Sequence, residues 1–312
     1  MGSGAIGPPA GGRMPPKVEL LSLDWGTTSL RGYLIGAAGE ILSTRVGPYG
    51  ILQINNGDFA TALRQFAGDW LNEFAYSPIL ASGMIGARQG WIEVPYADVP
   101  AGLADLHPVP FDGFEKPFYF VPGLVFHNPA GVPDIMRGEE TQVVGVGTDG
   151  IFLLPGSHSK WVLVRENKII WFATFMTGEL FAVLKDHTIL GRMMAGTKPD
   201  DQAFSRGVSW GKQSSSSLQA LFSARTLALF GDLPESGVAD YLSGLLIGAE
   251  IAEARDMIDT SNTDIIIVGG QDLSHRYEKA LEMCGLRSRA AAKDAAARGH
   301  WRIALAAGLV AS

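Results

Sequence analysis

Short apolar runs alternate with stretches of helical spacing along most of this chain. An apolar run at residues 18–24 predicts a buried strand, and strands at 30–35 and 40–46 follow it after short turns. Residues 58–75 are predicted to form an amphipathic helix, since apolar side chains recur there at spacings of three and four. The apolar stripe of this helix consists of Phe59, Leu63, Phe66, Trp70 and Phe74. A further strand at 77–82 ends this first series of elements.

A similar order of strands and turns restarts near residue 150. Strands are predicted at 151–154, 161–165 and 168–175. When Gly26 is set on Gly156, the later turns of the two series fall within a couple of residues of each other. This agreement indicates a degenerate internal duplication, and a coincidence between two β-meanders is the alternative.

The remaining segments complete a mixed α/β pattern. The Pro-rich stretch at 95–122 predicts loops and short edge strands, and the polar stretch at 195–217 predicts a surface loop. Helices are expected at residues 137–146, 175–190, 218–230, 238–258, 274–284 and 294–310, and a buried strand at 264–268.

A length of 312 residues predicts two domains. The chain is expected to fold, because 46% of its residues are apolar and 18% are charged. The net charge of −7 argues against nucleic acid as the main partner. We expect no membrane partner, since no apolar run approaches the roughly 18 residues that span a bilayer. The single cysteine, Cys284, fits a reducing cytoplasm, and its apolar helix face predicts core packing. Residues 1–17, rich in Gly, Pro and Ala, are expected to be a disordered leader.

The strongest local motif is a turn after the first strand that offers an acid, a glycine and three hydroxyls: Asp24, Gly26, Thr27, Thr28 and Ser29. The glycine lets backbone N–H groups approach phosphate oxygens, and the hydroxyls add donors. Asp24 can hold Mg²⁺ directly or through water. The alternative is an ordinary hairpin turn with a solvated aspartate.

The matching turn of the second half contains Gly156, Ser157, His158, Ser159 and Lys160. Two such turns facing each other could grip the phosphates of one nucleotide. For His158, a satisfied loop histidine and a donor to phosphate or substrate both stay open. Lys160 is expected to be a solvated strand residue.

Two glycine-rich strand ends are weaker signals. Gly269 and Gly270 end the predicted strand at 264–268, where a flat base or a phosphate could rest against the backbone. The exit of the strand at 77–82 could line a sugar site, with Arg88 meeting a carboxylate and Trp91 packing on a ring. A structural turn with Trp91 in the core is the alternative.

Paired carboxylates stand beside an arginine where the helix at 137–146 begins. In the functional interpretation, Glu139 or Glu140 is a general base for a hydroxyl nucleophile, and Arg137 binds an anion. In the structural alternative, the acids serve the helix macrodipole.

Several segments together resemble the 2-dehydro-3-deoxygalactonokinase family, from about residue 18 to the C-terminus. They are residues 24–31, 136–142, 155–163, 177–180 and 242–250. The family is similar to the actin-like ATPases and sugar kinases. The resemblance implies an α/β fold of two actin-like, ribonuclease H-like halves at 18–147 and 148–312. Each half would contain a mixed central sheet flanked by helices, with the nucleotide in the cleft between them.

The resemblance also implies roles for these residues. Asp24 would hold Mg²⁺, the turns that begin at Gly26 and Gly156 would be the two phosphate loops, and Gly269 with Gly270 would bind adenosine. The implied reaction transfers the γ-phosphoryl group of ATP to the C6 hydroxyl of 2-dehydro-3-deoxy-D-galactonate. An arginine would hold the substrate carboxylate, with Arg88, Arg31 and Arg137 as candidates in that order.

The base is less defined, because many sugar kinases of this superfamily place an aspartate at the start of this helix. Here the stretch offers Glu139 and Glu140, and Asp134 lies slightly upstream. We expect a cytoplasmic enzyme whose partners are ATP and a sugar acid, and we allow for a homodimer. The alternatives are a kinase for another sugar or sugar acid, and an ATP-driven switch of the actin or chaperone type.

Overall fold

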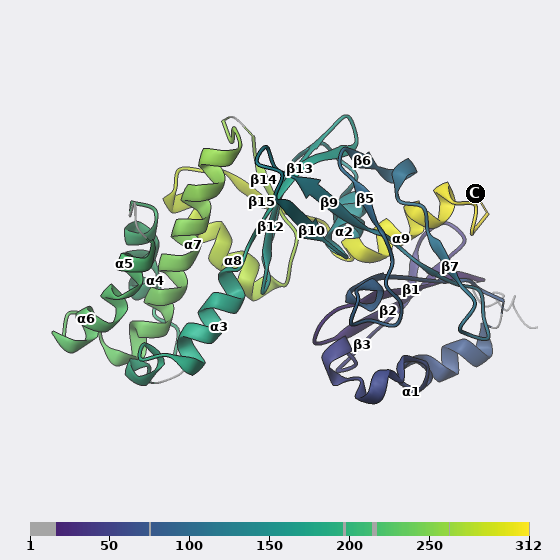
Figure 1. The fold of residues 1–312 in the computed structure, drawn as a ribbon, viewed down its shortest axis with the longest axis horizontal. Coiled ribbons are helices and arrows are strands. Elements are labelled where there is room, and N and C mark those ends of the chain that lie inside the picture. Colours follow the sequence, from purple (N-terminus) through teal and green to yellow (C-terminus); the bar gives the residue numbers. More distant parts are fainter. Residues whose placement is uncertain (1–16, 75, 196–197, 214–216, 262, 312) are drawn as a thin grey trace, which may run out of the picture.

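The computed structural model describes residues 17–74, 76–195, 198–213, 217–261 and 263–311. The predicted leader, apart from Lys17, lies outside the described residues, as do residues 196–197 and 214–216 of the polar stretch at 195–217. The first sheet and α1 lie at one end of the molecule and helices α3 to α8 at the other, with the second sheet between them (Figure 1). Within the described part of the chain, no helix is both long and apolar enough to cross a membrane.

The first sheet has the strand order β3-β2-β1-β4-β8-β7. Its strands are β1 (Val18–Trp25), β2 (Leu30–Gly36), β3 (Ile41–Gly47), β4 (Ile79–Gly83), β7 (Val109–Phe111) and β8 (Phe118–Phe120). The first three strands are antiparallel, whereas β4 runs parallel to β1 and β8 runs parallel to β4. The amphipathic helix α1 (Phe59–Glu73) packs its apolar stripe against this sheet, as the spacing predicts.

The second sheet repeats this arrangement, with the order β15-β14-β11-β12-β13-β6. Its strands are β6 (Ala101–Gly102), β11 (Gly150–Leu154), β12 (Ser159–Arg165), β13 (Lys168–Phe175), β14 (Ile265–Ile267) and β15 (Ser288–Ala290). Again the first three strands of the half are antiparallel, and β14 and β15 continue parallel to β11. The matching orders and directions agree with a duplication and confirm the predicted fold class of two similar α/β halves.

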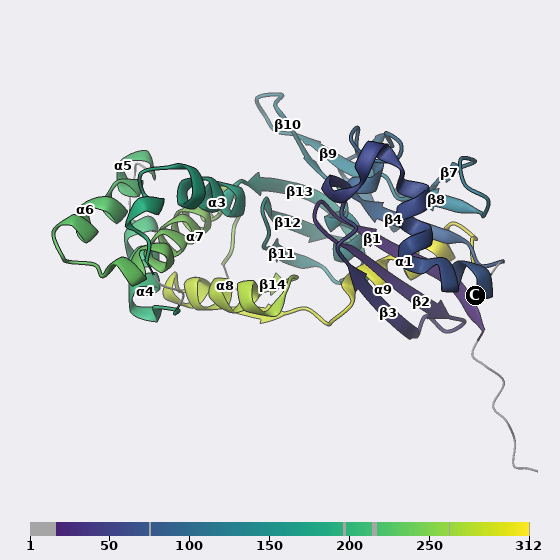
Figure 2. The same cartoon turned by 90° about the horizontal axis from the view of Figure 1, so that it is seen from below.

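The other elements connect and cover the sheets. The helices are α2 (Glu139–Val146), α3 (Thr177–His187), α4 (Asp201–Gly211), α5 (Ser217–Leu221), α6 (Ser223–Leu229), α7 (Val238–Met257), α8 (Gln271–Met283) and α9 (Ala295–Ala306). A small sheet contains β5 (Tyr96–Asp98), β9 (Gly123–His127) and β10 (Pro133–Met136). Single 3₁₀ turns occupy Ile51–Gln53, Asn55–Gly57, Met84–Gly86, Leu103–Asp105, Gly191–Met193 and Glu235–Gly237. Figure 2 shows α7 and α8 beside the second sheet.

Helices α2 and α9 cross where the halves meet. A Cβ atom on Gly145 would stand 1.9 Å from the carbonyl oxygen of Ala295, and one on Gly299 would stand 1.9 Å from that of Thr141. Only glycine permits this approach. Although α9 ends the chain, it packs against β1, β2 and β4 of the first half. The division of the chain between residues 147 and 148 stays a prediction.

Two expectations about local structure are wrong. The polar stretch at 195–217 contains α4, which packs along α7 through glycines that give little hydrophobic signal. A Cβ on Gly207 would lie 2.1 Å from the carbonyl oxygen of Tyr241, and one on Gly244 would lie 2.1 Å from that of Phe204. In the Pro-rich stretch, β8 lies inside the first sheet and not at its edge. Cys284 is buried and unpaired, as predicted.

Candidate active site

Glu139 lies near two charged residues from other elements, Asp24 and Lys160, where the halves face each other. Asp24 lies at the end of β1, Glu139 begins α2, and Lys160 is the second residue of β12. Glu139 Oε1 lies 3.4 Å from Lys160 Nζ. Arg31 Nη1 lies 3.6 Å from Asp24 Oδ2. Burial raises the pKa of Asp24, Arg31 opposes this effect, and the nearby charge of Glu139 adds to it.

The two adjacent glutamates point to different environments. Glu139 keeps a quarter of its side chain exposed, and its Oε2 accepts the backbone N–H of Arg137 at 2.9 Å. Glu140 is completely buried. Its Oε2 accepts the N–H of Gly138 at 2.6 Å and its Oε1 accepts the Thr141 hydroxyl at 2.9 Å. Burial, with a smaller contribution from Glu139, raises the pKa of Glu140 to about 8. Glu140 therefore accepts hydrogen bonds at the buried side of the α2 N-terminus, while Glu139 faces the second half.

The first predicted phosphate turn is held from behind by its own backbone and by the 3₁₀ turn at Ile51–Gln53. Gly26 N–H donates to the carbonyl of Ser29 at 2.9 Å, and Ile51 N–H donates to the carbonyl of Gly26 at 3.1 Å. The side chains of Thr27 and Thr28 are left exposed. The turn is thus fixed while its hydroxyls stay available to a ligand.

The start of α3 supports the second predicted phosphate turn. Glu179 N–H donates to the carbonyl of Ser157 at 2.9 Å, and its carboxylate lies 2.5 Å from His158 Nε2. A Cβ on Gly178 would stand 2.3 Å from the carbonyl oxygen of Gly156, so the helix and the turn are in direct backbone contact. His158 is half-exposed and already partnered by Glu179.

A buried network underlies the second turn, and sequence reasoning missed its centre, Glu250 of α7. The Glu250 carboxylate accepts hydrogen bonds from Trp161 Nε1 at 2.9 Å, Tyr277 Oη at 2.6 Å and Thr177 Oγ1 at 2.5 Å. Ser159 Oγ lies 2.8 Å from Tyr277 Oη. The network ties β12, α3, α7 and α8 together beside the turn. An acid within the apolar run of α7 was the available signal.

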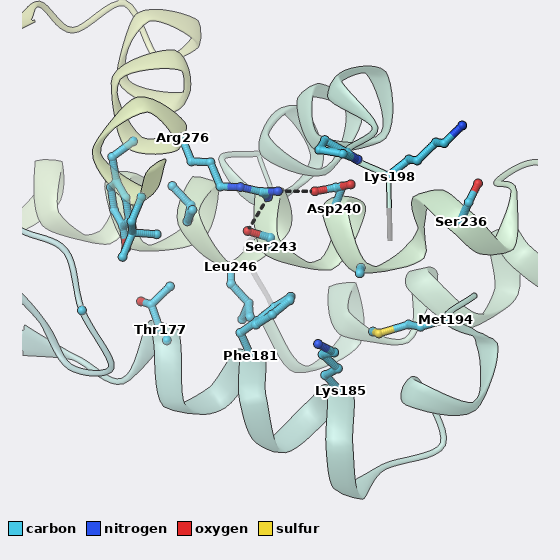
Figure 3. A pocket seen from close by; sticks show the side chains of 17 residues that line it. Thr177, Phe181, Lys185, Met194, Lys198, Ser236, Asp240, Ser243, Leu246 and Arg276 are labelled. Carbon is cyan, nitrogen blue, oxygen red and sulfur yellow. Dashed lines mark hydrogen bonds and ion pairs between the residues drawn. The ribbon is translucent and has the colours of Figure 1, made fainter. Parts of the chain in front are cut away.

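A cavity of about 510 Å³ opens beside Gly156, between α3, α7 and α8. Phe181 and Leu246 line it with apolar surface (Figure 3). At its α8 side, Arg276 donates to Asp240 Oδ1 at 2.5 Å and to Ser243 Oγ at 3.2 Å. Lys185 and Lys198 also line the cavity (Figure 3). The arrangement offers an apolar slot with cationic side chains at its rim.

A second cavity of about 740 Å³ lies between the halves, and Asp24, Arg31 and Gln142 line it together with Gly269 and Gly270. The predicted adenosine glycines therefore belong to this cavity and not to the slot between the helices. Helix α8 separates the two spaces. Its residues Leu273, Arg276 and Tyr277 line the slot, whereas Ser274, His275 and Glu278 line the cavity between the halves.

The three arginines proposed for the substrate carboxylate differ in accessibility. Arg88 is 80% exposed, and within the described part of the chain its guanidinium pairs with Glu93, 3.4 Å away. Arg31 is half-exposed beside Asp24. Arg137 is buried, donates from Nη2 to the carbonyl of Val94 at 2.7 Å, and has no hydrogen-bond partner for Nε or Nη1 among the described residues.

Three other residues are placed differently from what their motifs suggest. Trp91 packs among aromatic rings, with Phe59 stacked at 6.0 Å and Phe111 edge-on at 5.1 Å, which supports its structural interpretation. Asp134, the next candidate base, accepts both the N–H and the hydroxyl of Thr174, at 2.7 and 2.6 Å. Lys160 is buried, so the expectation of a solvated strand residue is wrong. Its strand lies under α2 of the other half, which the local pattern could not show.

The duplicated sheets, each with a glycine- and hydroxyl-rich turn after its first strand, define the actin-like fold class of kinases and ATPases. The fold is shared with component A of the (R)-2-hydroxyglutaryl-CoA dehydratase of Acidaminococcus fermentans. That structure matches with a TM-score of 0.50 and 13% identity, over 92% of this chain and 96% of the other.

Within this class, the chain belongs to the 2-keto-3-deoxy-galactonokinase family, whose model matches residues 24–303. It is 33% identical over 280 residues to the 2-dehydro-3-deoxygalactonokinase of Escherichia coli K12, covering 88% of this chain and 94% of the relative. A Sinorhizobium meliloti structure named for the same activity matches with a TM-score of 0.82 and 34% identity, over 91% of this chain and 98% of the other. The resemblance drawn from the motifs is confirmed.

Proposed function

We propose that this chain transfers the γ-phosphoryl group of ATP to the C6 hydroxyl of 2-dehydro-3-deoxy-D-galactonate, in the cytoplasm, as a step of galactonate and galactose catabolism. Family membership supports the reaction, and the relatives named above suggest the substrate. The observation that carries the proposal in this chain is the meeting of Asp24 and Glu139 from one half with Lys160 and the Gly156 turn of the other. Such an arrangement suits phosphoryl transfer, which depends on positioning and charge neutralisation.

We assign the role of general base to Glu139. Its carboxylate is partly exposed, faces the second half and lies near Asp24, whereas Glu140 is completely buried and both of its oxygens accept hydrogen bonds inside the protein. As the C6 oxygen attacks the γ-phosphorus, its proton passes to Glu139. The bond from phosphorus to the bridging oxygen breaks, and ADP leaves with the electron pair.

The residues present fit a magnesium ion. Mg²⁺ in kinases is usually held by one or two carboxylates together with the nucleotide phosphates. Asp24 supplies such a carboxylate in the cavity between the halves, which leaves Glu139 to accept the proton. The described part of the chain contains no group of three or more His, Cys, Asp or Glu residues that could hold an ion without the nucleotide. Asp24 would hold the ion directly or through water. When bound, Mg²⁺ neutralises charge on the phosphates.

We place the adenosine of ATP in the slot between α3, α7 and α8. The slot begins at Gly156, has apolar walls and a volume of about 510 Å³, which suits a base and ribose. Gly269 would still lie close to the bound nucleotide. A Cβ atom on Gly269 would lie 3.4 Å from Pro155 Cδ, which is directly beside the second turn. The phosphates would then extend from the slot over the Gly156 turn toward Asp24.

For the substrate carboxylate we favour Arg88. Its guanidinium is exposed and held by one long ion pair, so it can turn to an incoming anion. The Nε and Nη1 atoms of Arg137 are buried in the protein. Nη1 packs against Gly86, where an added Cβ atom would lie only 3.0 Å from it. Arg137 therefore supports the turn that follows β4.

A panel of acceptors tests the proposed function. Purified protein is assayed with ATP and Mg²⁺ for ADP release in the presence of 2-keto-3-deoxy acids that differ at C4, and of neutral sugars. We expect strong stimulation by the galactonate derivative. Stimulation by another acid alone would change the acceptor, and sugar-independent ATP hydrolysis would favour an actin-like switch.

A further inference from the structure

Lys160 has no role in the reaction as described so far, although it lies among the groups that would perform it. Its side chain is only 5% exposed. The ammonium lies 3.4 Å from Glu139 Oε1 and 3.5 Å from the carbonyl oxygen of His158. Lys160 thus touches both the assigned base and the second phosphate turn.

The protein's own groups satisfy this ammonium incompletely. A lysine offers three N–H donors, and burying its charge is costly unless it is well paired. Both contacts of Lys160 are at the long end of the hydrogen-bond range. A group with more negative charge and shorter contacts would therefore bind here favourably.

The alternation of β12 directs Lys160 toward the reacting groups. Ser159 and Trp161 point to the side of the sheet that carries Glu250, through the hydrogen bonds to Tyr277 and to Glu250 itself. Lys160 points to the opposite side, toward α2 and Glu139. A phosphoryl group that passes from the Gly156 turn to an acceptor beside Glu139 must travel along this side.

We propose that Lys160 is a catalytic residue whose ammonium donates hydrogen bonds to the γ-phosphoryl oxygens as the group is transferred. The inference rests on the proposed function. Lys160 keeps all three of its protons throughout, since the proton of the C6 hydroxyl passes to Glu139 and the bond electrons leave with ADP. Before transfer the ammonium contacts Glu139, and during transfer it contributes positive charge where the phosphoryl oxygens lie.

A purely structural ion pair between the halves is the competing explanation, and Lys168 provides a matched control. Lys168 of β13 also pairs with a carboxylate from the first half, Asp105, at 3.6 Å, but it is 52% exposed and lies away from the cluster. Lys160→Met and Lys168→Met are therefore the same change in two similar pairs. Only the first removes a charge beside the reacting groups.

The test compares the affinity of each variant for Mg·ADP and for Mg·ADP·fluoroaluminate, a mimic of the transferring phosphoryl group, by calorimetry. For Lys160→Met we expect kcat and the affinity for the mimic to fall together by about 10²–10³-fold, the usual loss for one preorganised donor. The affinity for ADP should stay within about two-fold, because ADP lacks the γ-phosphoryl oxygens that the donor would meet. Lys168→Met should match the wild-type protein in kcat, in the affinity for ADP and in the affinity for the mimic.

Equal losses for ADP and for the mimic, or no loss for either, would overturn the role of Lys160. If Lys160→Met does not fold, Lys160→Gln, which keeps a hydrogen-bond donor to Glu139 without the charge, carries the same expectation. The mimic is measured with and without the sugar acid. A wild-type protein that fails to phosphorylate the sugar acid contradicts the proposed function, while the ratio of affinities still decides the role of the lysine.

Discussion

Replacing Glu139 and Glu140 separately by glutamine should give two different kinds of loss. Glu139→Gln keeps the shape of the side chain but removes the proton acceptor that faces Lys160. Turnover should fall by about 10²–10⁴-fold, the usual contribution of general acid–base catalysis. This corresponds to roughly 3–5 kcal/mol of activation free energy. The KM values should change little. Tm should fall modestly, because the amide oxygen can still accept from the buried Lys160 ammonium but no longer neutralises its charge.

Glu140→Gln should instead act on stability. The carboxylate accepts two buried hydrogen bonds, from Gly138 N–H and the Thr141 hydroxyl, and an amide keeps one acceptor oxygen. Leaving one buried donor unpaired costs about 1–3 kcal/mol. For a chain of this size that lowers Tm by roughly 2–4 °C per kcal/mol.

The pH dependence of stability separates Glu140 from Glu139 further. Burial raises the pKa of Glu140 to about 8 from 4.5, so the folded state holds a proton that the unfolded state releases. The contribution of this proton to stability is complete below about 4.5 and declines as the pH rises toward 8. Wild-type protein should therefore lose stability relative to Glu140→Gln over this interval.

The assay combines turnover in the ADP-coupled reaction with melting curves between pH 5 and pH 8 for both variants. A loss of turnover in Glu140→Gln as large as in Glu139→Gln, without a change in Tm, would refute the assignment of the base. Full turnover in both variants would move the base elsewhere, and Asp134 would be the next residue to change.

Four further changes test other parts of the account. Asp24→Asn should lower turnover by on the order of 10²-fold or more while circular dichroism stays unchanged; near-normal activity at saturating Mg²⁺ would eliminate Asp24 as the metal residue. Arg88→Met should raise the KM for the sugar acid by about 10–100-fold, the loss of one charged hydrogen bond, and leave the KM for ATP unchanged; unchanged values for both would show that the carboxylate is held elsewhere. Glu250→Gln turns an amide N–H₂ toward buried donors, so Tm should fall and the KM for ATP should rise, and an unaltered KM would limit the network to stability. Burial lowers the pKa of His300 to about 3, so wild-type stability should decline as the pH falls below about 6.5, and the slope should flatten in His300→Asn when melting curves are compared.

The strand pattern was predictable because each β-meander carries its own apolar runs and turn residues. The elements at 18–24 and 30–35 appear as β1 and β2. The matching turns of the two series indicated a duplication, and the strand orders of the two sheets agree with it. The inner strand β8 was harder to recognise, because its pattern is only Phe118–Phe120 within a Pro-rich stretch. Helix α4 was missed because its buried apolar side chains, Phe204 and Val208, are few within a polar stretch, and glycines make its closest contacts with α7.

The turns at Gly26 and Gly156 could be located from the sequence because their motifs are local, and their role in binding phosphate stays a prediction. The candidate site was not predictable where burial comes from another half of the chain. Lys160 looks like an ordinary strand lysine until α2 covers it, and Glu139 and Glu140 differ only in which way the first turn of the helix points them. Spacing alone does not decide such questions, because they depend on how the two halves pack.

The position of the new phosphate ester tests the central claim most directly. The protein is incubated with ATP, Mg²⁺ and 2-dehydro-3-deoxy-D-galactonate, and the product is followed over time by ³¹P–¹H correlation NMR, with Asp24→Asn as the impaired control. The account predicts that phosphorus couples to the two C6 protons and that this signal grows on the order of 10²-fold or more slowly in the control. A phosphate on another carbon, or release of free phosphate with the sugar acid unchanged, would contradict it.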